Sequence, residues 1–263
     1  MNRKRFAVML LAAFLFNGCS GKQAKAPEPQ EEEAKMVADQ KVMAFSLAGF
    51  EKTGKKKWEV QGRSADIMSE VVNLTDVVAK AYGEQIDMTL TADKGTFNRA
   101  TNDAHFEDHV VVTGTDGTKM TTDAVDWKNA EQKVTTDKPV KVYTETNDVK
   151  EDGTKARVPT TITCDGPMEI DYAKNLAVFN KNVRVDDERG KLFCDTATAY
   201  YDAKTKQVSK IVAKGNVIIV RGGSWTYSDE AIYLAPEQKI ILSGSPKVMI
   251  YPEEAKAAQN KGP

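Results

Sequence analysis

The chain is poor in the residues that most catalytic and metal sites need. Its 263 residues include three cysteines and two histidines. Few ligands are therefore available for a metal, and neither histidine is placed to activate a serine nucleophile. On a strand, the spacing of His105 and His109 separates them by about 13 Å, too far to chelate one ion. The composition predicts that the protein is not an enzyme and holds no metal or other cofactor.

The chain also lacks an excess of positive charge. Lysine and arginine number 37 against 38 aspartate and glutamate residues, a formal net charge of -1. A protein that binds DNA or RNA needs a basic surface to neutralise phosphates. This balance argues against a nucleic-acid partner.

The apolar run near the N-terminus is short for a membrane span. It extends from Phe6 to Phe16 after three basic residues, whereas a spanning helix needs about 20 residues. This order is typical of a secretory signal peptide. The run ends in a small residue before Cys19, which resembles the lipobox of bacterial lipoproteins. We therefore expect a signal peptide over 1–18 and acylation of Cys19; a plain secretory signal or an uncleaved anchor is the alternative.

Two polar segments flank the central part of the chain. Residues 20–33 contain no aromatic or β-branched side chain, so little can offset the entropy of ordering them. We expect a flexible, acylated tether over 19–41 and a polar tail over 252–263. The protein is then a periplasmic, membrane-anchored lipoprotein, and either membrane could hold it.

Between residues 42 and 251 the sequence repeats with a period near 30. An aspartate followed by alternating residues and an aromatic recurs at Asp93, Asp123, Asp165, Asp195 and Asp229. A second apolar alternation follows each copy, so one repeat is a pair of strands. Because these aspartates recur with the repeat, we expect them at turns or strand ends rather than as paired catalytic carboxylates.

The strands have a period of two. In one of them Ile86, Met88 and Leu90 share a face. Roughly thirteen short strands separated by polar turns predict an all-β domain, as a sandwich, a jelly roll or a β-solenoid. The polar stretch 144–157 is expected to be a long loop between two halves of that domain.

Several stretches carry a resemblance to a known family. They are Leu-Thr-Ala-Asp-Lys-Gly-Thr-Phe97, Phe-Glu-Asp-His-Val-Val-Val-Thr113, Ala-Lys-Gly-Asn-Val217, and the hairpin that leads into Trp58. Together they resemble the OstA-like repeat of the LptC/LptA family of lipopolysaccharide-export bridge proteins. Residues 42–143 are similar to LptC and residues 158–251 to LptA, so an LptC, an LptA and a fused variant are all open.

The resemblance implies an elongated, twisted antiparallel β-jelly roll built from the 30-residue strand pairs. It also implies a periplasmic bridge component that carries the acyl chains of lipopolysaccharide, or a related glycolipid, in an apolar groove. Ordinary core packing is the alternative for each groove position, and a structural or adhesive envelope lipoprotein is the alternative function. The expected groove residues are Met88, Leu90, Phe106, Val110, Val112, Met120, Val140, Val142, Val183, Tyr200, Val217 and Ile219.

The last strand region, 239–251, carries few charges and is expected to be an open sheet edge. Open edges pair with further strands. The expected partners are related OstA-like proteins, another copy of this chain, or an ABC transporter, as in the family. The contact residues we predict there are Ile241, Val248, Met249 and Ile250.

The two remaining cysteines lie one repeat apart. Cys164 and Cys194 each directly precede a repeat aspartate, so stacking of repeats would bring them onto neighbouring strands. Export supplies an oxidising compartment. We expect a disulfide between them; two separate buried thiols are the alternative.

Overall fold

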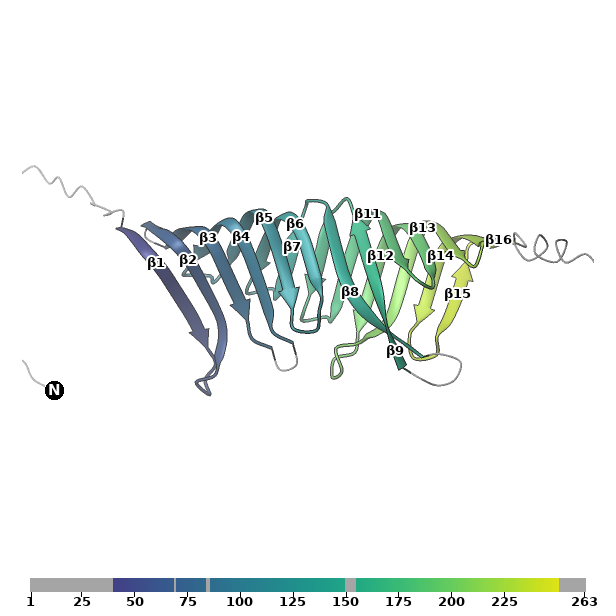
Figure 1. The fold of residues 1–263 in the computed structure, drawn as a ribbon, viewed down its shortest axis with the longest axis horizontal. Coiled ribbons are helices and arrows are strands. Elements are labelled where there is room, and N and C mark those ends of the chain that lie inside the picture. Colours follow the sequence, from purple (N-terminus) through teal and green to yellow (C-terminus); the bar gives the residue numbers. More distant parts are fainter. Residues whose placement is uncertain (1–39, 69, 84–85, 150–154, 251–263) are drawn as a thin grey trace, which may run out of the picture. The chain divides into compact units, whose positions relative to one another are not determined.

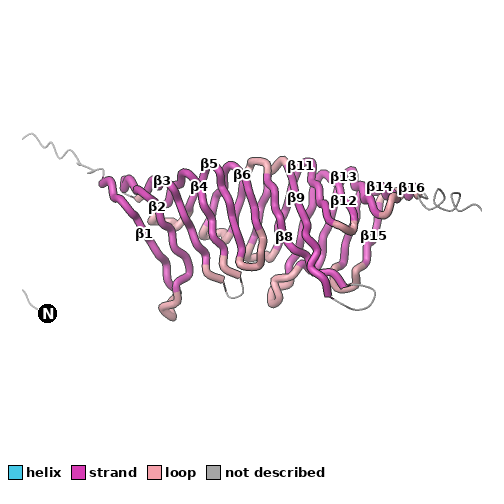
Figure 2. The backbone as a smooth tube through the Cα atoms, in the orientation of Figure 1, coloured by secondary structure: helices cyan, strands magenta, loops and turns pink. Residues whose placement is uncertain are grey.

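A computed structural model describes residues 40–68, 70–83, 86–149 and 155–250. These belong to one compact unit that begins at Val37, and Figure 2 shows them as strands and connecting loops. Within these residues no helix is long and apolar enough to cross a membrane. Cys19 and the predicted signal peptide and tail lie outside the described residues, as does the tether up to residue 39.

Sixteen antiparallel strands form one sheet. The first eight are β1 (Gln40–Phe50), β2 (Lys56–Met68), β3 (Val71–Ala81), β4 (Met88–Asn98), β5 (Ala104–Gly114), β6 (Lys119–Lys128), β7 (Lys133–Thr136) and β8 (Val140–Val149). The others are β9 (Lys155–Cys164), β10 (Met168–Asp171), β11 (Leu176–Asp187), β12 (Gly190–Tyr201), β13 (Val208–Arg221), β14 (Ser224–Leu234), β15 (Lys239–Ser243) and β16 (Lys247–Met249). The predicted all-β fold is confirmed.

The strands follow one another in chain order across the sheet (Figure 1), from β1 at one edge to β15 and β16 at the other. Thirteen strand positions lie on the path from β1 to β15. β7 and β8 occupy one position in two pieces, since β6 pairs with both. β10 and β9 likewise both pair with β11, and β15 and β16 both pair with β14.

Each long strand bends near its middle, where the alternation of inward and outward side chains is interrupted. Cys194 and Ala197 of β12 are both buried although they are three residues apart. In β11, Phe179 and Val183 are buried on either side of Lys181 and Asn182, which both have a positive φ. Strict alternation gives an even spacing for one face, and the three-residue spacing breaks it. The register between β11 and β12 shifts at this point, as a β-bulge produces. Both halves of a strand can therefore face the same interior.

The bends divide the sheet into two arms, which we name from β4. The first arm contains the start of β4 (88–91) and the second arm contains its end (95–98). β8, β9 and β16 belong to the first arm, and β7, β10 and β15 belong to the second. This bent, folded sheet is a jelly-roll arrangement in which each arm presents its inner face to the other.

The repeat aspartates lie at these bends. His109 of β5 has a left-handed φ of 54°, and its Nδ1 lies 2.7 Å from the Asp93 carboxylate of β4. In the second half, Nδ2 of Asn216, which has a φ of 50°, donates to Asp195 Oδ2 at 2.8 Å. The carboxylates therefore hold the bulge of the next strand. Our expectation of turns or strand ends is correct for Asp165, which directly follows the end of β9. It is wrong for the other four repeat aspartates, which lie within strands: Asp93, Asp123, Asp195 and Asp229.

The predicted loop over 144–157 is wrong for most of its length. Residues 144–149 of β8 pair with 155–160 of β9 as a hairpin, and residues 150–154 lie outside the described part. The stretch suggested a loop because nearly all of its residues are polar or charged. Thr160 is nevertheless buried on the strand, where its hydroxyl donates to the Val158 carbonyl at 3.2 Å.

The predicted disulfide is also wrong. Cys164 and Cys194 are free, buried thiols. Cys164 ends β9 and Cys194 lies on β12, and β11 runs between these strands, with its Val183 opposite Cys194. Two strand spacings of about 4.8 Å put the Cα atoms near 10 Å apart, beyond the limit of about 7 Å for a disulfide. A hairpin repeat places equivalent residues two strands apart, not on neighbouring strands.

Candidate functional site

The inner face of the first arm carries an unbroken row of side chains from one sheet edge to the other. Each member pairs across the strands with the next, from β1 to β16. All but one are apolar. We call them the inner row: Leu47, Val60, Ala79, Leu90, Val112, Met120, Val142, Ile162, Val185, Leu192, Ile219, Thr226 and Val248.

The two arms face one another across this row. Trp58 of β2 pairs through Ala81 of β3 with Met88, at the start of β4. Phe97 lies nine residues further along β4, about 30 Å away on a straight strand. The ring centroids of Trp58 and Phe97 are nevertheless only 5.3 Å apart. The arms therefore fold together, and these two rings meet between them at the β1 end of the sheet.

A glycine makes room for the tryptophan. A Cβ atom on Gly49 of β1 would lie 2.3 Å from the Trp58 indole, a separation that no side chain could accept. Gly49 is the cross-strand partner of Trp58. The indole therefore covers the backbone of β1 and extends the apolar interior to that edge of the sheet.

The structure places most of the predicted groove residues on inner faces. Five of them, Leu90, Val112, Met120, Val142 and Ile219, belong to the inner row. Val110, Val140, Val183 and Val217 are fully buried beside the bends, and Phe106 is buried in the second arm. Met88 is half-buried, opposite Ala81 and Gly114.

Tyr200 was assigned to the wrong face. On β12 the buried Ala197 shares a face with Tyr201, which packs against the core. Tyr200 points the other way, where Lys210 Nζ lies 4.3 Å from its ring centroid. Counting in steps of two across the bulge shifts every later residue to the opposite face. The repeat aspartate, Asp195, is the sequence signal that could have located the bulge and identified Tyr201.

The interior is electrically neutral at its centre. Both thiols are affected by burial, which raises the pKa of Cys164 and raises that of Cys194 to about 12, so neither ionises near neutral pH. Among the described residues Asp171 is the buried charged group; the Lys174 backbone N–H and its Nζ, 3.1 Å away, hold the Asp171 pKa below its usual value. Within the same residues, no cluster of His, Cys, Asp and Glu could hold a metal ion.

The last strands leave large apolar side chains exposed. Val248 is 58% exposed and Ile250 73%, and Ile241 and Met249 are exposed as well. β15 and β16 each pair with β14 on one side. The predicted position of this open edge is therefore correct, while contact of these residues with a partner stays a prediction.

Two family models together match most of the chain. Residues 6–161 match the model of the family described as lipopolysaccharide-assembly, LptC-related. Residues 161–261 match that of the LptA/(LptD N-terminal domain) LPS transport proteins. No curated protein matches the chain significantly. Among solved structures, the chain is similar to LptH from Pseudomonas aeruginosa, whose title calls it the LptA homologous periplasmic component of the conserved lipopolysaccharide transport device. The two sequences are 18% identical, and the match covers 63% of this chain and 95% of LptH, with a TM-score of 0.38.

A bent antiparallel sheet with an apolar interior and two open edges defines an all-β jelly-roll protein. The first family model covers more than half of the chain, so the protein belongs to the LptC-related family of lipopolysaccharide-assembly proteins. Lipopolysaccharide transport in the periplasm is thereby its function class. The two matched segments meet at residue 161, within β9, and the sheet continues through that point.

Proposed function

We propose that this chain carries the acyl chains of lipopolysaccharide, or a related glycolipid, along the inner row between its two arms. The observation that carries the proposal is the continuity of this row from β1 to β16. An acyl chain needs no hydrogen-bond partner, and each methylene withdrawn from water contributes about 0.8 kcal/mol. A neutral path that is apolar at all but one position suits that cargo, since no charge along it would have to be desolvated.

The arms must separate to admit an acyl chain. Several inner residues, Val110, Val183 and Val217 among them, are about 1% exposed. A bound acyl chain would replace the contacts that these side chains now make across the interior. The sugar headgroup, which is strongly hydrated, would stay in water at the open side of the arms.

The two open edges would extend the path beyond one chain. β1 at one edge and β15 with β16 at the other each lack one strand neighbour in the described structure. Pairing with a related OstA-like protein or with an ABC transporter subunit would continue the inner row into the partner. The LptC-like and LptA-like segments would then act as one uninterrupted part of the bridge. An acylated Cys19 would hold the protein at a membrane.

Site-specific photo-crosslinking tests the lipid path. A photoreactive amino acid at Leu90 or Val142 should capture glycolipid in cells, because both side chains lie in the inner row. The matched controls are Thr91 and Lys141, one residue away on the same strands and exposed on the outer face. Capture of glycolipid at neither inner position in a folded protein would leave the structural or adhesive envelope role instead.

A further inference from the structure

The outer face of the first arm changes character along the sheet. Two cross-strand rows run over it parallel to the inner row, and from β4 to β9 they are mostly polar. The first row there contains Thr91, Val111, Thr121, Lys141 and Thr163, and the second contains Thr89, Thr113, Lys119, Tyr143 and Thr161. A face of this composition is favourable in contact with water.

In the last strands the same two rows become aromatic and aliphatic. The first row continues from Thr163 through Arg184 to Phe193, Ile218 and Tyr227. The second continues from Thr161 through Asp186 and Lys191 to Val220, Trp225 and Met249. We call the six residues Phe193, Ile218, Val220, Trp225, Tyr227 and Met249 the aromatic patch.

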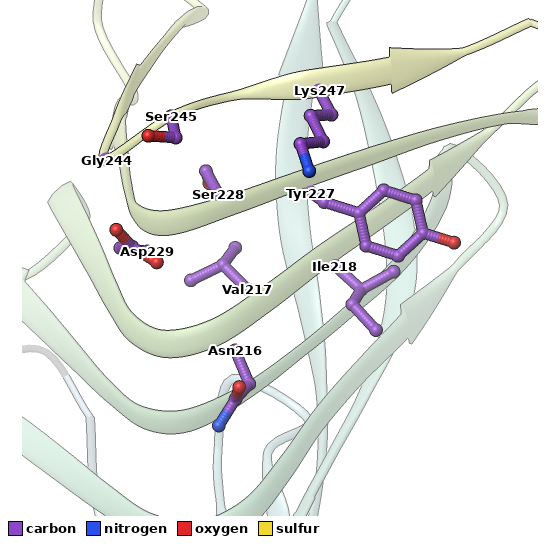
Figure 3. Close-up of a pocket in the computed structure, with 9 residues that line it drawn as sticks. All are labelled: Asn216, Val217, Ile218, Tyr227, Ser228, Asp229, Gly244, Ser245 and Lys247. Carbon is purple, nitrogen blue, oxygen red and sulfur yellow. The ribbon is translucent and has the colours of Figure 1, made fainter.

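The patch faces away from the interior. Leu192 and Ile219, the strand neighbours of Phe193 and Ile218, pack against the core, so their neighbours point to the outer face. Trp225 is 37% exposed and Met249 is 44% exposed. The Trp225 and Tyr227 rings stack with centroids 6.4 Å apart and an interplanar angle of 21°. Figure 3 shows the Tyr227 ring beside Ile218, with Lys247 on the adjoining strand.

Cationic groups border the patch on both sides along the rows. The Arg184 guanidinium lies 5.0 Å from the Phe193 ring centroid, and Lys247 is the cross-strand partner of Tyr227 at the other end. Lys191 adjoins Val220 and pairs with Asp186 at 2.8 Å. Arg221 follows Val220 and is exposed. The chain as a whole is slightly acidic, so this basic border is local.

We propose that the aromatic patch rests on the interface of an anionic phospholipid membrane. Tryptophan and tyrosine are amphipathic side chains that favour the boundary between water and lipid. Arginine and lysine at the border complement anionic headgroups, and their aliphatic stems accompany the apolar side chains. A protein partner could also cover aromatic rings, but cations on both sides of the patch favour a uniformly anionic surface. The proposal does not depend on the lipid path, because the patch lies on the opposite face of the sheet.

Vesicle binding of the full chain tests this assignment. We expect co-sedimentation with phosphatidylglycerol/phosphatidylethanolamine vesicles to exceed that with neutral phosphatidylcholine vesicles. The double substitution Trp225→Ser with Met249→Ser should weaken binding to the anionic vesicles about tenfold, equivalent to about 1.4 kcal/mol. The matched control is Tyr143→Ser, which removes an exposed aromatic from the polar part of the same row and should leave binding unchanged. All variants share Cys19, so an anchor would contribute equally to each.

Fluorescence locates the contact on the patch. Brominated phospholipids should quench the emission of the natural chain, and Trp225→Phe should abolish that quenching while Trp58 and Trp127 remain. Equal binding of the patch variant and the Tyr143→Ser control, or equal binding to neutral vesicles, would overturn the proposal. If light scattering without lipid finds a dimer, and Trp225→Ser makes the protein monomeric, the patch binds a second copy of the chain instead.

Discussion

The two halves of the interior share one geometry but differ in the side chains that fill it. In the second arm of the first half, one cross-strand row runs through Leu74, Gly95, Phe106 and Val125. The equivalent row in the second half runs through Phe179, Ala197, Ala213 and Ala231. Bends and register shifts occur in both halves. The fold therefore depends on the pattern of inner and outer positions, and the size of the inner side chains can vary.

This difference bears on how readily the arms separate. Burial stabilises in proportion to apolar area, at about 25 cal/mol per Å², and an alanine buries far less area than a leucine or phenylalanine. Opening the arms beside Ala213 and Ala231 thus exposes less apolar surface than opening them beside their equivalents, Phe106 and Val125. The second half should admit an acyl chain at a lower cost in free energy, while the first half supplies more of the stability.

The largest expected effect tests the first half. Leu74→Ala removes a side chain that is 2% exposed and packed in the core. The lost burial and the cavity should lower the free energy of unfolding by about 2–5 kcal/mol. Urea denaturation followed by circular dichroism measures this change. A loss below about 1 kcal/mol would mean that the first half does not carry the stability assigned to it.

A smaller effect is expected from filling the second half. Ala213→Leu adds methylenes where the arms already meet, since Ala213 is 2% exposed. Overpacking should lower the free energy of unfolding by about 1–3 kcal/mol. The matched control is Thr198→Leu, on the outer face of β12 beside the Val212 that precedes Ala213. Equal unfolding free energies for Ala213→Leu and the natural chain would contradict a closed interior at this point.

The smallest effect concerns the clamps at the bends, the Asp93–His109 pair in the first half and the Asp195–Asn216 pair in the second. Asp93 holds a histidine, whereas Asp195 holds an asparagine. The Asp93 hydrogen bond, and then its charge, raises the pKa of His109 above 6.5. A raised pKa in the folded state contributes stability that is fully present below the unfolded value and is lost as the pH rises through the folded value.

Substitution of His109 by asparagine should therefore remove a pH dependence. The natural chain should lose a little stability between about pH 6 and about pH 9, and His109→Asn should lose less. Denaturant titrations at the two pH values measure this difference. Identical pH profiles for the two proteins would show that the His109–Asp93 pair makes no contribution to stability.

The fold was predictable where periodicity suffices, and the errors arose at the bends. Alternation placed Leu90, Val112 and Val142 on the inner face, and the repeat indicated the paired strands. Tyr200 was misplaced because an extra residue at a bulge reverses the faces, and nothing in simple alternation records it. The Cys164–Cys194 bridge failed for a related reason, since a hairpin period brings equivalent residues to every second strand. The hairpin over 144–160 was missed because residues 144–157 are nearly all polar or charged and show no apolar alternation.

The continuity of the inner row has a consequence for how such a protein can change in length. Each strand adds one residue to the row, and neighbouring strands are about 4.8 Å apart, so thirteen positions give a path of roughly 58 Å. Insertion or loss of one hairpin, with its clamp at the bend, would change the reach of the path by about 10 Å and leave its cross-section as it was. The bent hairpin is thus a unit of length, and gene duplication could fit the protein to a wider or narrower gap without redesign of its binding surface.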